Sequence, residues 1–241
     1  MSDEEIKAAA IEFARRNRKR IAEEITDSEK IPPNVVPVSI FMAGSPGAGK
    51  TEFSKSFIDL AEAGGRLPLL RIDADELRQL LPGYTGNNSH LFQQSISRLI
   101  EEIHNFVLRQ KQSFILDGTL GNYDKAVVNI TRSLKRERSV FIFYVYQRPE
   151  VAWKFTQARE AVEGRNIPKS AFIEKFLAAR ENVQKLTKEF GGRIRIMLIT
   201  KNFETNIVES FVNIHPGDQR IDSYLPEIDR KSTRLNSSHR L

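Results

Sequence analysis

The sequence contains no cysteine among its 241 residues. Disulfide bonds, thiolate metal sites and cysteine nucleophiles are therefore excluded. Histidine is also scarce, and the four copies are too scattered to place two metal ligands on one helical face. No apolar run approaches the roughly 20 residues that a membrane-spanning helix needs, and the N-terminus has no apolar signal segment. We therefore expect a cytoplasmic protein with no membrane partner, whose histidines are solvated or hydrogen-bonded.

A concentrated positive charge is missing as well, although the formal net charge is +6. The last residues, Lys231 to Leu241, hold three cations and no anion, while glutamates flank the basic run Arg15 to Arg20. Binding to nucleic acid needs basic side chains gathered on one face. The dispersed charge instead favours balanced helix surfaces, and we expect no nucleic-acid partner.

The length and the 40% apolar composition suit a single α/β domain. Asp3 to Ile25 carries apolar residues at helical intervals, so residues 1–30 are expected to form an amphipathic helix packed on the domain. A proline-rich stretch then stops regular structure, and residues 31–228 form the domain itself. Residues 229–241 are poor in large apolar side chains and resemble translated vector read-through. We expect this tail to be disordered and exclude it from functional reasoning.

Five short apolar runs alternate with segments of helical periodicity. Nearly continuous apolar character is typical of strands in a parallel sheet that is covered on both faces. The sequence thus predicts a doubly wound, mainly parallel α/β sheet of five or more strands with helices on both faces. The expected strands are Val38 to Ala43, Leu67 to Asp73, Ser113 to Asp117, Val140 to Tyr146 and Ile194 to Thr200.

A complete Walker A pattern directly follows the first apolar run. Its glycines allow backbone N–H groups to surround phosphate oxygens, and the helix that begins near Lys50 adds the positive end of its dipole. Lys50 is expected to reach the β- and γ-phosphates of ATP or GTP, and the Thr51 hydroxyl to coordinate Mg²⁺. The expected nucleotide-binding residues are Gly44, Ser45, Pro46, Gly47, Ala48, Gly49, Lys50 and Thr51.

Carboxylates follow two other strands, at the sheet edge where ligands bind in open α/β folds. One of them is expected to accept the proton of an attacking hydroxyl, and we choose Asp75 as this base. Asp73 lies closer to its strand and is equally suited to cap the next helix, with Glu76 three residues on. Asp117 is expected either to hold Mg²⁺ through water or to bind a substrate hydroxyl, and Thr119 adds a second hydroxyl beside it.

Two arginines flank a glycine-containing corner after the fourth strand. Phosphoryl transfer needs mobile cations that close over the transferring group, so Arg159 and Arg165 are candidates for a catalytic lid. The alternative is that both are surface arginines on an exposed helix.

Together these motifs resemble the zeta toxin family, the kinase component of epsilon/zeta toxin–antitoxin systems. The resemblance spans Val38 to Asn202 and rests on the nucleotide loop, the Ile72-Asp73-Ala74-Asp75 segment, Asp117-Gly118-Thr119, and Arg159 with Gly164-Arg165-Asn166-Ile167-Pro168-Lys169. It implies that Asp75 is the catalytic base and that Arg159 and Arg165 stabilise the transferring phosphate. The implied substrate is a UDP-sugar, UDP-N-acetylglucosamine, and the implied partner is an antitoxin protein.

Two departures from the family pattern lie where the sugar is expected to bind. Asp117 stands where the family has Glu in a Glu-Gly-Thr segment, and Leu120-Gly121-Asn122 replaces a segment that often carries an arginine. Glu101 matches a substrate-contact position of the family, with an exposed helix residue as the alternative. Besides a nucleotide-sugar kinase, the open alternatives are a kinase for another hydroxyl substrate, such as an antibiotic, a nucleoside or NAD, and an NTPase switch or nucleic-acid module.

Overall fold

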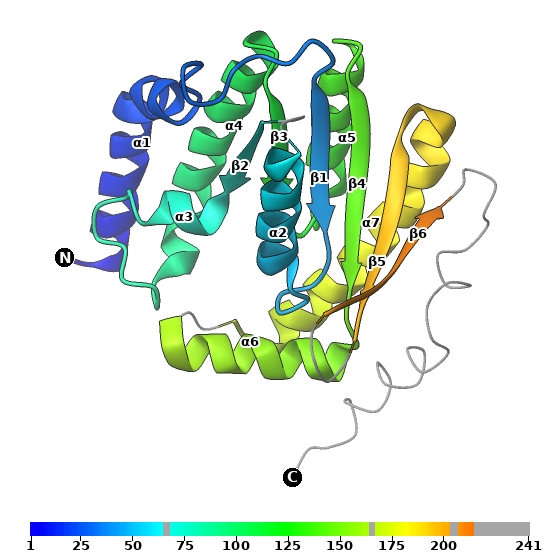
Figure 1. The fold of residues 1–241 in the computed structure, drawn as a ribbon. Helices are drawn as coiled ribbons and strands as arrows, with labels where there is room; N and C mark the ends of the chain where they lie inside the picture. Colours follow the sequence, from blue (N-terminus) through cyan, green and yellow to red (C-terminus); the bar gives the residue numbers. More distant parts are fainter. Residues whose placement is uncertain (65–67, 164–166, 203–206, 215–241) are drawn as a thin grey trace.

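The computed structural model describes residues 1–64, 68–163, 167–202 and 207–214. Its centre is a six-stranded sheet with the strand order β2-β3-β1-β4-β5-β6. The first five strands run parallel, and β6 pairs antiparallel with β5 (Figure 1). The strands are β1 (Val38–Ala43), β2 (Leu69–Asp73), β3 (Ser113–Asp117), β4 (Ser139–Tyr146), β5 (Arg195–Lys201) and β6 (Val208–Ile214).

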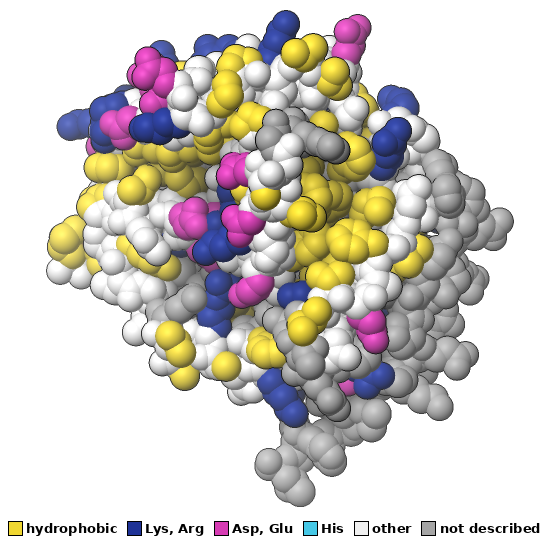
Figure 2. Space-filling view, viewed as in Figure 1, with side chains coloured by type: hydrophobic (Ala, Val, Ile, Leu, Met, Phe, Trp, Pro, Cys, Tyr) yellow, Lys and Arg dark blue, Asp and Glu magenta, His cyan; other side chains and the backbone are white. Residues whose placement is uncertain are grey.

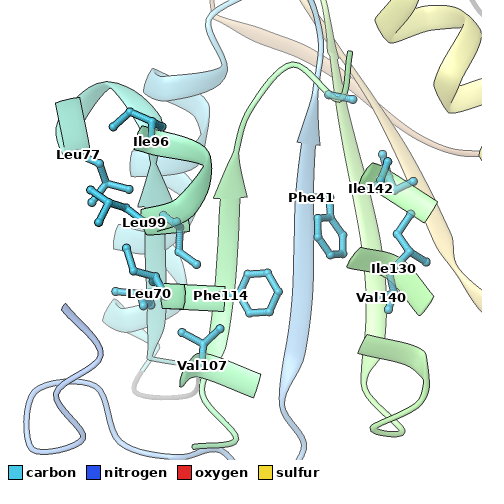
Figure 3. Close-up of a cluster of buried hydrophobic side chains, with 14 of the residues drawn as sticks. Phe41, Leu70, Leu77, Ile96, Leu99, Val107, Phe114, Ile130, Val140 and Ile142 are labelled. Carbon is cyan, nitrogen blue, oxygen red and sulfur yellow. The ribbon is translucent and has the colours of Figure 1, made fainter. Parts of the chain in front are cut away.

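Helices lie on both faces of this sheet, as the apolar runs predicted (Figure 1). One face packs against α2, whose Phe53 joins a buried cluster with Ile40 and Met42 of β1. The other face packs against α4, α5 and α7, and α1 packs on α4. Figure 3 shows Phe41 and Phe114 on this face beside side chains of α4 and α5. The helices are α1 (Asp3–Ile25), α2 (Lys50–Ala63), α3 (Ala74–Arg78), α4 (Gln93–Arg109), α5 (Tyr123–Leu134), α6 (Pro149–Glu163) and α7 (Lys169–Phe190), with the 3₁₀ turns η1 (Ser89–Phe92) and η2 (Gly191–Arg193).

The N-terminal helix α1 is capped and anchored by specific contacts. Ser2 and Glu5 form a capping box that satisfies backbone N–H groups at its start. Its buried alanines, Ala10 and Ala14, allow close packing on α4. At its other end, Gln112 Nε2 donates hydrogen bonds of 2.9 and 2.7 Å to the carbonyls of Thr26 and Ile31. The helix is therefore tied to the sheet edge on the side of β2 and β3.

The expected fourth and fifth strands are close to the observed ones: β4 begins one residue earlier, at Ser139, and β5 is shifted by one residue, to Arg195–Lys201. Two further differences have simple causes. The second strand begins at Leu69, because Pro68 precedes it, and Leu67 lies outside the described residues. The edge strand β6 alternates exposed and less exposed residues, so it lacks the continuous apolar run that marks the five buried strands. Among the residues that the structure describes, no helix has both the length and the apolar character needed to cross a membrane.

His104 is a buried histidine on the apolar side of α4. Its ring is 1% exposed and packs edge-on against Phe41 and Phe114. Burial, followed by the positive charges of Arg132 and Arg138, lowers the pKa of His104 to about 3. The imidazole is therefore neutral in the folded protein at neutral and mildly acidic pH.

This lowered pKa predicts a loss of stability in acid. The unfolded chain binds a proton near the ordinary pKa of 6.5, whereas the folded chain binds it only near 3. Between these values, protonation favours the unfolded state, so the free energy of unfolding falls as the pH falls, by up to about 1.4 kcal/mol per pH unit from this group. Urea unfolding between about pH 7 and pH 4 is expected to show a shallower slope for His104→Gln. His90→Gln, at an exposed position, is the control, and an unchanged slope in His104→Gln would contradict the prediction.

Candidate active site

The loop between β1 and α2 has a backbone that only glycine permits at several positions. Gly44, Gly47 and Gly49 have φ angles of 140°, 72° and 81°. A Cβ atom on Gly44 would lie 2.4 Å from the Val145 carbonyl oxygen, and one on Gly47 would lie 2.0 Å from the Ala152 carbonyl oxygen. The glycines therefore allow the loop to curl tightly against β4 and α6, as a phosphate-binding loop requires.

Replacing Gly47 with alanine is expected to destabilise the protein and to weaken nucleotide binding. The new methyl group would clash with the α6 backbone, and alanine disfavours a positive φ by about 1–2 kcal/mol. We expect the melting temperature to fall by at least about 4 °C in a thermal unfolding experiment. Gly118→Ala is the matched control, since a Cβ atom there meets nothing within 4 Å. Equal melting temperatures for both variants would refute the steric argument.

Three features of the loop fit a bound polyphosphate. No side chain caps the start of α2, so the backbone N–H groups of its first turn have no side-chain acceptor there. The Ser45 hydroxyl is buried and makes no hydrogen bond to the described residues. Lys50 is 9% exposed, and its Nζ donates to the carbonyls of Gly44 and Ser45 at 3.1 and 2.6 Å. The ammonium group is thus held over the loop, where phosphate oxygens would lie.

A pocket of about 690 Å³ opens at the carboxyl ends of the parallel strands. It brings together most of the side chains that the sequence singled out: Lys50, Thr51, Asp75, Asp117, Thr119 and Arg159. Figure 2 shows acidic and basic side chains close together near the middle of the molecule, in the region of α2 and α3. Glu101 on α4 is exposed and is not among the lining residues, whereas its neighbour Ile100 is. Arg165 lies outside the described residues.

The two acids that follow β2 have different environments. Asp73 caps α3, because its Oδ1 accepts a hydrogen bond of 2.8 Å from the Asp75 backbone N–H. The capping alternative for Asp73 is thereby confirmed, although Glu76 pairs with Arg71 rather than completing a capping box. Burial, together with the nearby charge of Asp117, raises the pKa of Asp73. Asp75 sits in the first turn of α3, where its side chain is 35% exposed and forms an ion pair with Arg78.

Asp117 at the end of β3 is held by donors that converge on one oxygen. Its Oδ2 accepts from Arg71 Nε at 3.2 Å, Arg71 Nη2 at 2.8 Å and the Ser54 hydroxyl at 3.1 Å. The Ser54 hydroxyl also lies 3.0 Å from the Thr51 carbonyl oxygen. Asp117 is therefore linked to the residue proposed to bind Mg²⁺ through a single serine. Oxygen ligands and a hydroxyl at this place fit a magnesium ion carried with the nucleotide.

Three basic residues that contact the nucleotide loop or the acids near it were not identified from the sequence. Arg71 holds Asp117, Arg78 holds Asp75, and Lys201 Nζ donates to the Gly49 carbonyl oxygen at 3.3 Å. Burial lowers the pKa of Lys201. The three-residue spacing of Asp75 and Arg78, which places both on one side of a helix, is a signal that would have found Arg78. The contacts of Arg71 with Asp117 and of Lys201 with Gly49 join distant segments and leave no local signal, although the two-residue spacing of Arg71 and Asp73 places both on one face of a strand.

A strand, a glycine-rich loop and a helix, with carboxylates at the ends of the neighbouring parallel strands, define a P-loop fold of the kinase type. The family model for the zeta toxin matches residues 21–211, and the chain therefore belongs to the zeta toxin family. The chain thus combines membership of this family with a P-loop fold.

Solved structures with the same fold include one from a toxin–antitoxin system and one of a complex of two proteins. A chain from the PezAT chromosomal toxin–antitoxin system of Streptococcus pneumoniae aligns with a TM-score of 0.64 at 16% identity, covering 98% of this chain and 95% of that one. The AvrRxo1-ORF1:-ORF2 complex with ATP gives a TM-score of 0.57 at 17% identity, covering 91% of this chain and 70% of that one.

Curated relatives match a shorter region. The ATP-dependent protease ATPase subunit HslU of Petrotoga mobilis is 26% identical over 120 residues, which is 50% of this chain. This chain spans only 23% of HslU and 26% of the related ClpY subunit of Bacillus subtilis.

Proposed function

We propose that this protein is a kinase that transfers the γ-phosphoryl group of ATP or GTP to a hydroxyl of a nucleotide sugar, most simply UDP-N-acetylglucosamine. One observation carries the proposal: the phosphate-binding loop, Asp75 and Arg159 line a single pocket. The fold neighbour whose structure contains ATP supports ATP as the donor. Kinase chemistry needs a bound triphosphate, a base for the acceptor and cations near the transferring group, and the residues that line this pocket are of the types that would serve these roles.

On the donor side, each residue of the loop has a role that follows from its position. The backbone N–H groups and the uncapped start of α2 bind the phosphates, and Lys50 places its charge beside them. Thr51 and, more distantly, Asp117 would hold Mg²⁺, which when bound neutralises charge on the phosphate oxygens. Arg159, which α6 places at the pocket wall, stabilises the same oxygens, and Arg165 is proposed to join it.

On the acceptor side, Asp75 is the proposed base. Its carboxylate is accessible in the pocket, and Arg78 fixes its orientation through their ion pair. The acceptor hydroxyl would donate its proton to this carboxylate as its oxygen bonds to phosphorus and the bond to the nucleoside diphosphate breaks. Asp117 and Thr119 would bind other hydroxyls of the sugar, and Glu101 is kept as a proposed contact that would require movement of the acceptor or of α4.

The experiment that tests this function is a direct assay of phosphoryl transfer. Purified protein is incubated with ATP or GTP, Mg²⁺ and, in separate reactions, UDP-sugars, nucleosides, NAD and hydroxyl-bearing antibiotics. Mass spectrometry then detects an acceptor that has gained one phosphate. We expect the phosphate on a UDP-sugar, with an Asp75→Asn variant as the blank. Transfer only to a nucleoside, NAD or an antibiotic would show that the acceptor is not a nucleotide sugar. The absence of transfer to any acceptor would overturn the kinase proposal.

The proposed partner is a protein inhibitor. The proposed location is the cytoplasm, which supplies both the nucleoside triphosphate and the nucleotide sugar. The two fold neighbours come from structures of a toxin–antitoxin system and of a two-protein complex. We propose that an antitoxin obstructs the nucleotide side of the pocket. Co-expression with the product of an adjacent open reading frame is expected to give a complex that no longer binds ATP, and a complex with unchanged ATP affinity would contradict this mode of inhibition.

A further inference from the structure

The acids at the ends of β2 and β3 are directly opposite each other. The parallel register pairs Asp73 with Asp117. Arg71, two residues before Asp73, projects from the same face of β2, since side chains alternate along a strand. Ser54 of α2 contacts this face, so the charges lie beneath the helix that follows the nucleotide loop. Two like charges in direct opposition, both less than one-tenth exposed, destabilise a sheet unless a cation joins them.

Arg71 is the cation that joins them. Its side chain is 9% exposed and forms ion pairs with Asp73 and Asp117, and with Glu76 at the edge of the network. The planar guanidinium places Nε and Nη2 on Asp117 Oδ2, while Nη1 contacts Glu76. Nε also lies 3.0 Å from the Ser54 hydroxyl. One side chain thus fixes the ends of two strands and the first turns of α2 and α3.

These contacts involve only one of the two carboxylate oxygens of Asp117. All three hydrogen bonds that the described residues make to this carboxylate end on Oδ2, and none ends on Oδ1. Asp117 nevertheless lines the pocket next to Thr51. The arrangement fixes the rotation of the carboxylate and keeps one oxygen available to a ligand in the pocket.

We propose that Arg71 is a positioning residue that orients Asp117 toward the magnesium–nucleotide complex and, through Asp73, fixes the start of the helix that carries Asp75. The inference rests on the proposed kinase function and deepens it. Arg71 touches neither substrate, because it is absent from the residues that line the pocket. Its effect passes through the Asp117 carboxylate on one side and through the Asp73 cap of the Asp75 N–H on the other.

The test uses Arg71→Lys, which keeps the positive charge and the buried alkyl chain. A lysine has a single nitrogen, so it cannot reproduce the fork that contacts Asp73, Asp117 and Glu76 at once. We expect kcat to fall by about 10- to 100-fold, the usual effect of losing an outer support of a metal-binding group. Titration calorimetry with a non-hydrolysable ATP analogue gives a second readout. The affinity without Mg²⁺ should match the parent protein, while the gain in affinity that Mg²⁺ provides should shrink by about tenfold.

The control is Glu76→Gln, which removes a partner of Arg71 whose side chain is 57% exposed and lies outside the pocket. It should retain the kcat and the Mg²⁺ effect of the parent protein. An Arg71→Lys variant with an unchanged kcat and an unchanged Mg²⁺ effect would overturn the proposal. If the parent protein phosphorylates no acceptor, the kinase proposal fails by itself, and the calorimetric comparison still decides the role of Arg71.

Discussion

The Asp75→Asn variant is expected to lose at least about 100-fold in kcat while its affinity for ATP stays nearly unchanged. The amide has almost the same shape as the carboxylate but cannot take a proton from an attacking hydroxyl. A 100-fold loss corresponds to about 2.7 kcal/mol of transition-state stabilisation. The ATP affinity should persist because Asp75 belongs to α3 and pairs with Arg78, whereas the groups proposed to bind the phosphates lie in the loop before α2 and in its first turn. Steady-state kinetics and calorimetry measure the two quantities separately.

The neighbouring Glu76→Gln variant is the appropriate control, because it removes a carboxylate one residue away that does not line the pocket. It should keep kcat within about twofold of the parent value. Full turnover in Asp75→Asn would remove Asp75 from the role of base. A loss of ATP affinity as large as the loss of kcat would instead assign it to the donor site.

The elements that could be predicted from sequence are those whose signal is local. The ranges Asp3–Ile25, Val38–Ala43 and Ser113–Asp117 agree with the structure at both ends. Each is a run with one periodicity, bounded by a cap, a proline or a glycine, so neighbouring residues suffice to define it. The same holds for the nucleotide loop, because its glycines follow from the backbone angles that the turn requires.

The edge strand β6 lacks such a signal, and the short helix α3 has only its capping residue. In β6 the exposure alternates along the strand, but the residue types do not follow it: Phe211 is exposed, while Ser210 lies on the less exposed side. The sequence therefore shows neither a continuous apolar run nor an alternation of apolar and polar residues. Helix α3 has only five residues and is defined by the Asp73 cap more than by any periodicity. The strand β6 depends on its pairing with β5, which only the completed sheet supplies, whereas α3 depends on a contact between residues two apart.

The residues of the candidate site likewise divide into those with a local sequence signal and those without one. In the sequence, Arg71 is a charged residue within an apolar strand. Its role becomes visible only when β2 pairs with β3 and brings Asp117, 46 residues away, into contact with its guanidinium. Lys201 is further still, 152 residues from the carbonyl that it contacts. For Glu101, a match to a sequence position selected a residue that does not line the pocket. Because successive residues of a helix point about 100° apart, Ile100 faces the pocket while Glu101 is exposed.

The Lys50→Ala variant is expected to bind ATP at least about tenfold more weakly and to lose about 100-fold or more in kcat. The Lys50 side chain is nearly buried, so its charge acts on phosphate oxygens with little screening by solvent. The variant loses that charge, and it also loses the hydrogen bonds from Nζ to the carbonyls of Gly44 and Ser45. The effect on turnover should exceed the effect on binding, because negative charge on the phosphate oxygens changes most during transfer.

Two variants separate the charge of Lys50 from its contribution to the loop. Lys50→Met keeps most of the alkyl chain, so it should retain the melting temperature better than Lys50→Ala while losing the same ATP affinity and turnover. Lys55→Ala, at an exposed position on the same helix, should leave all three quantities unchanged. If Lys50→Met bound ATP as tightly as the parent protein, the ammonium group would serve only to hold the two carbonyls. The phosphates would then be bound by the backbone N–H groups and the start of α2 alone.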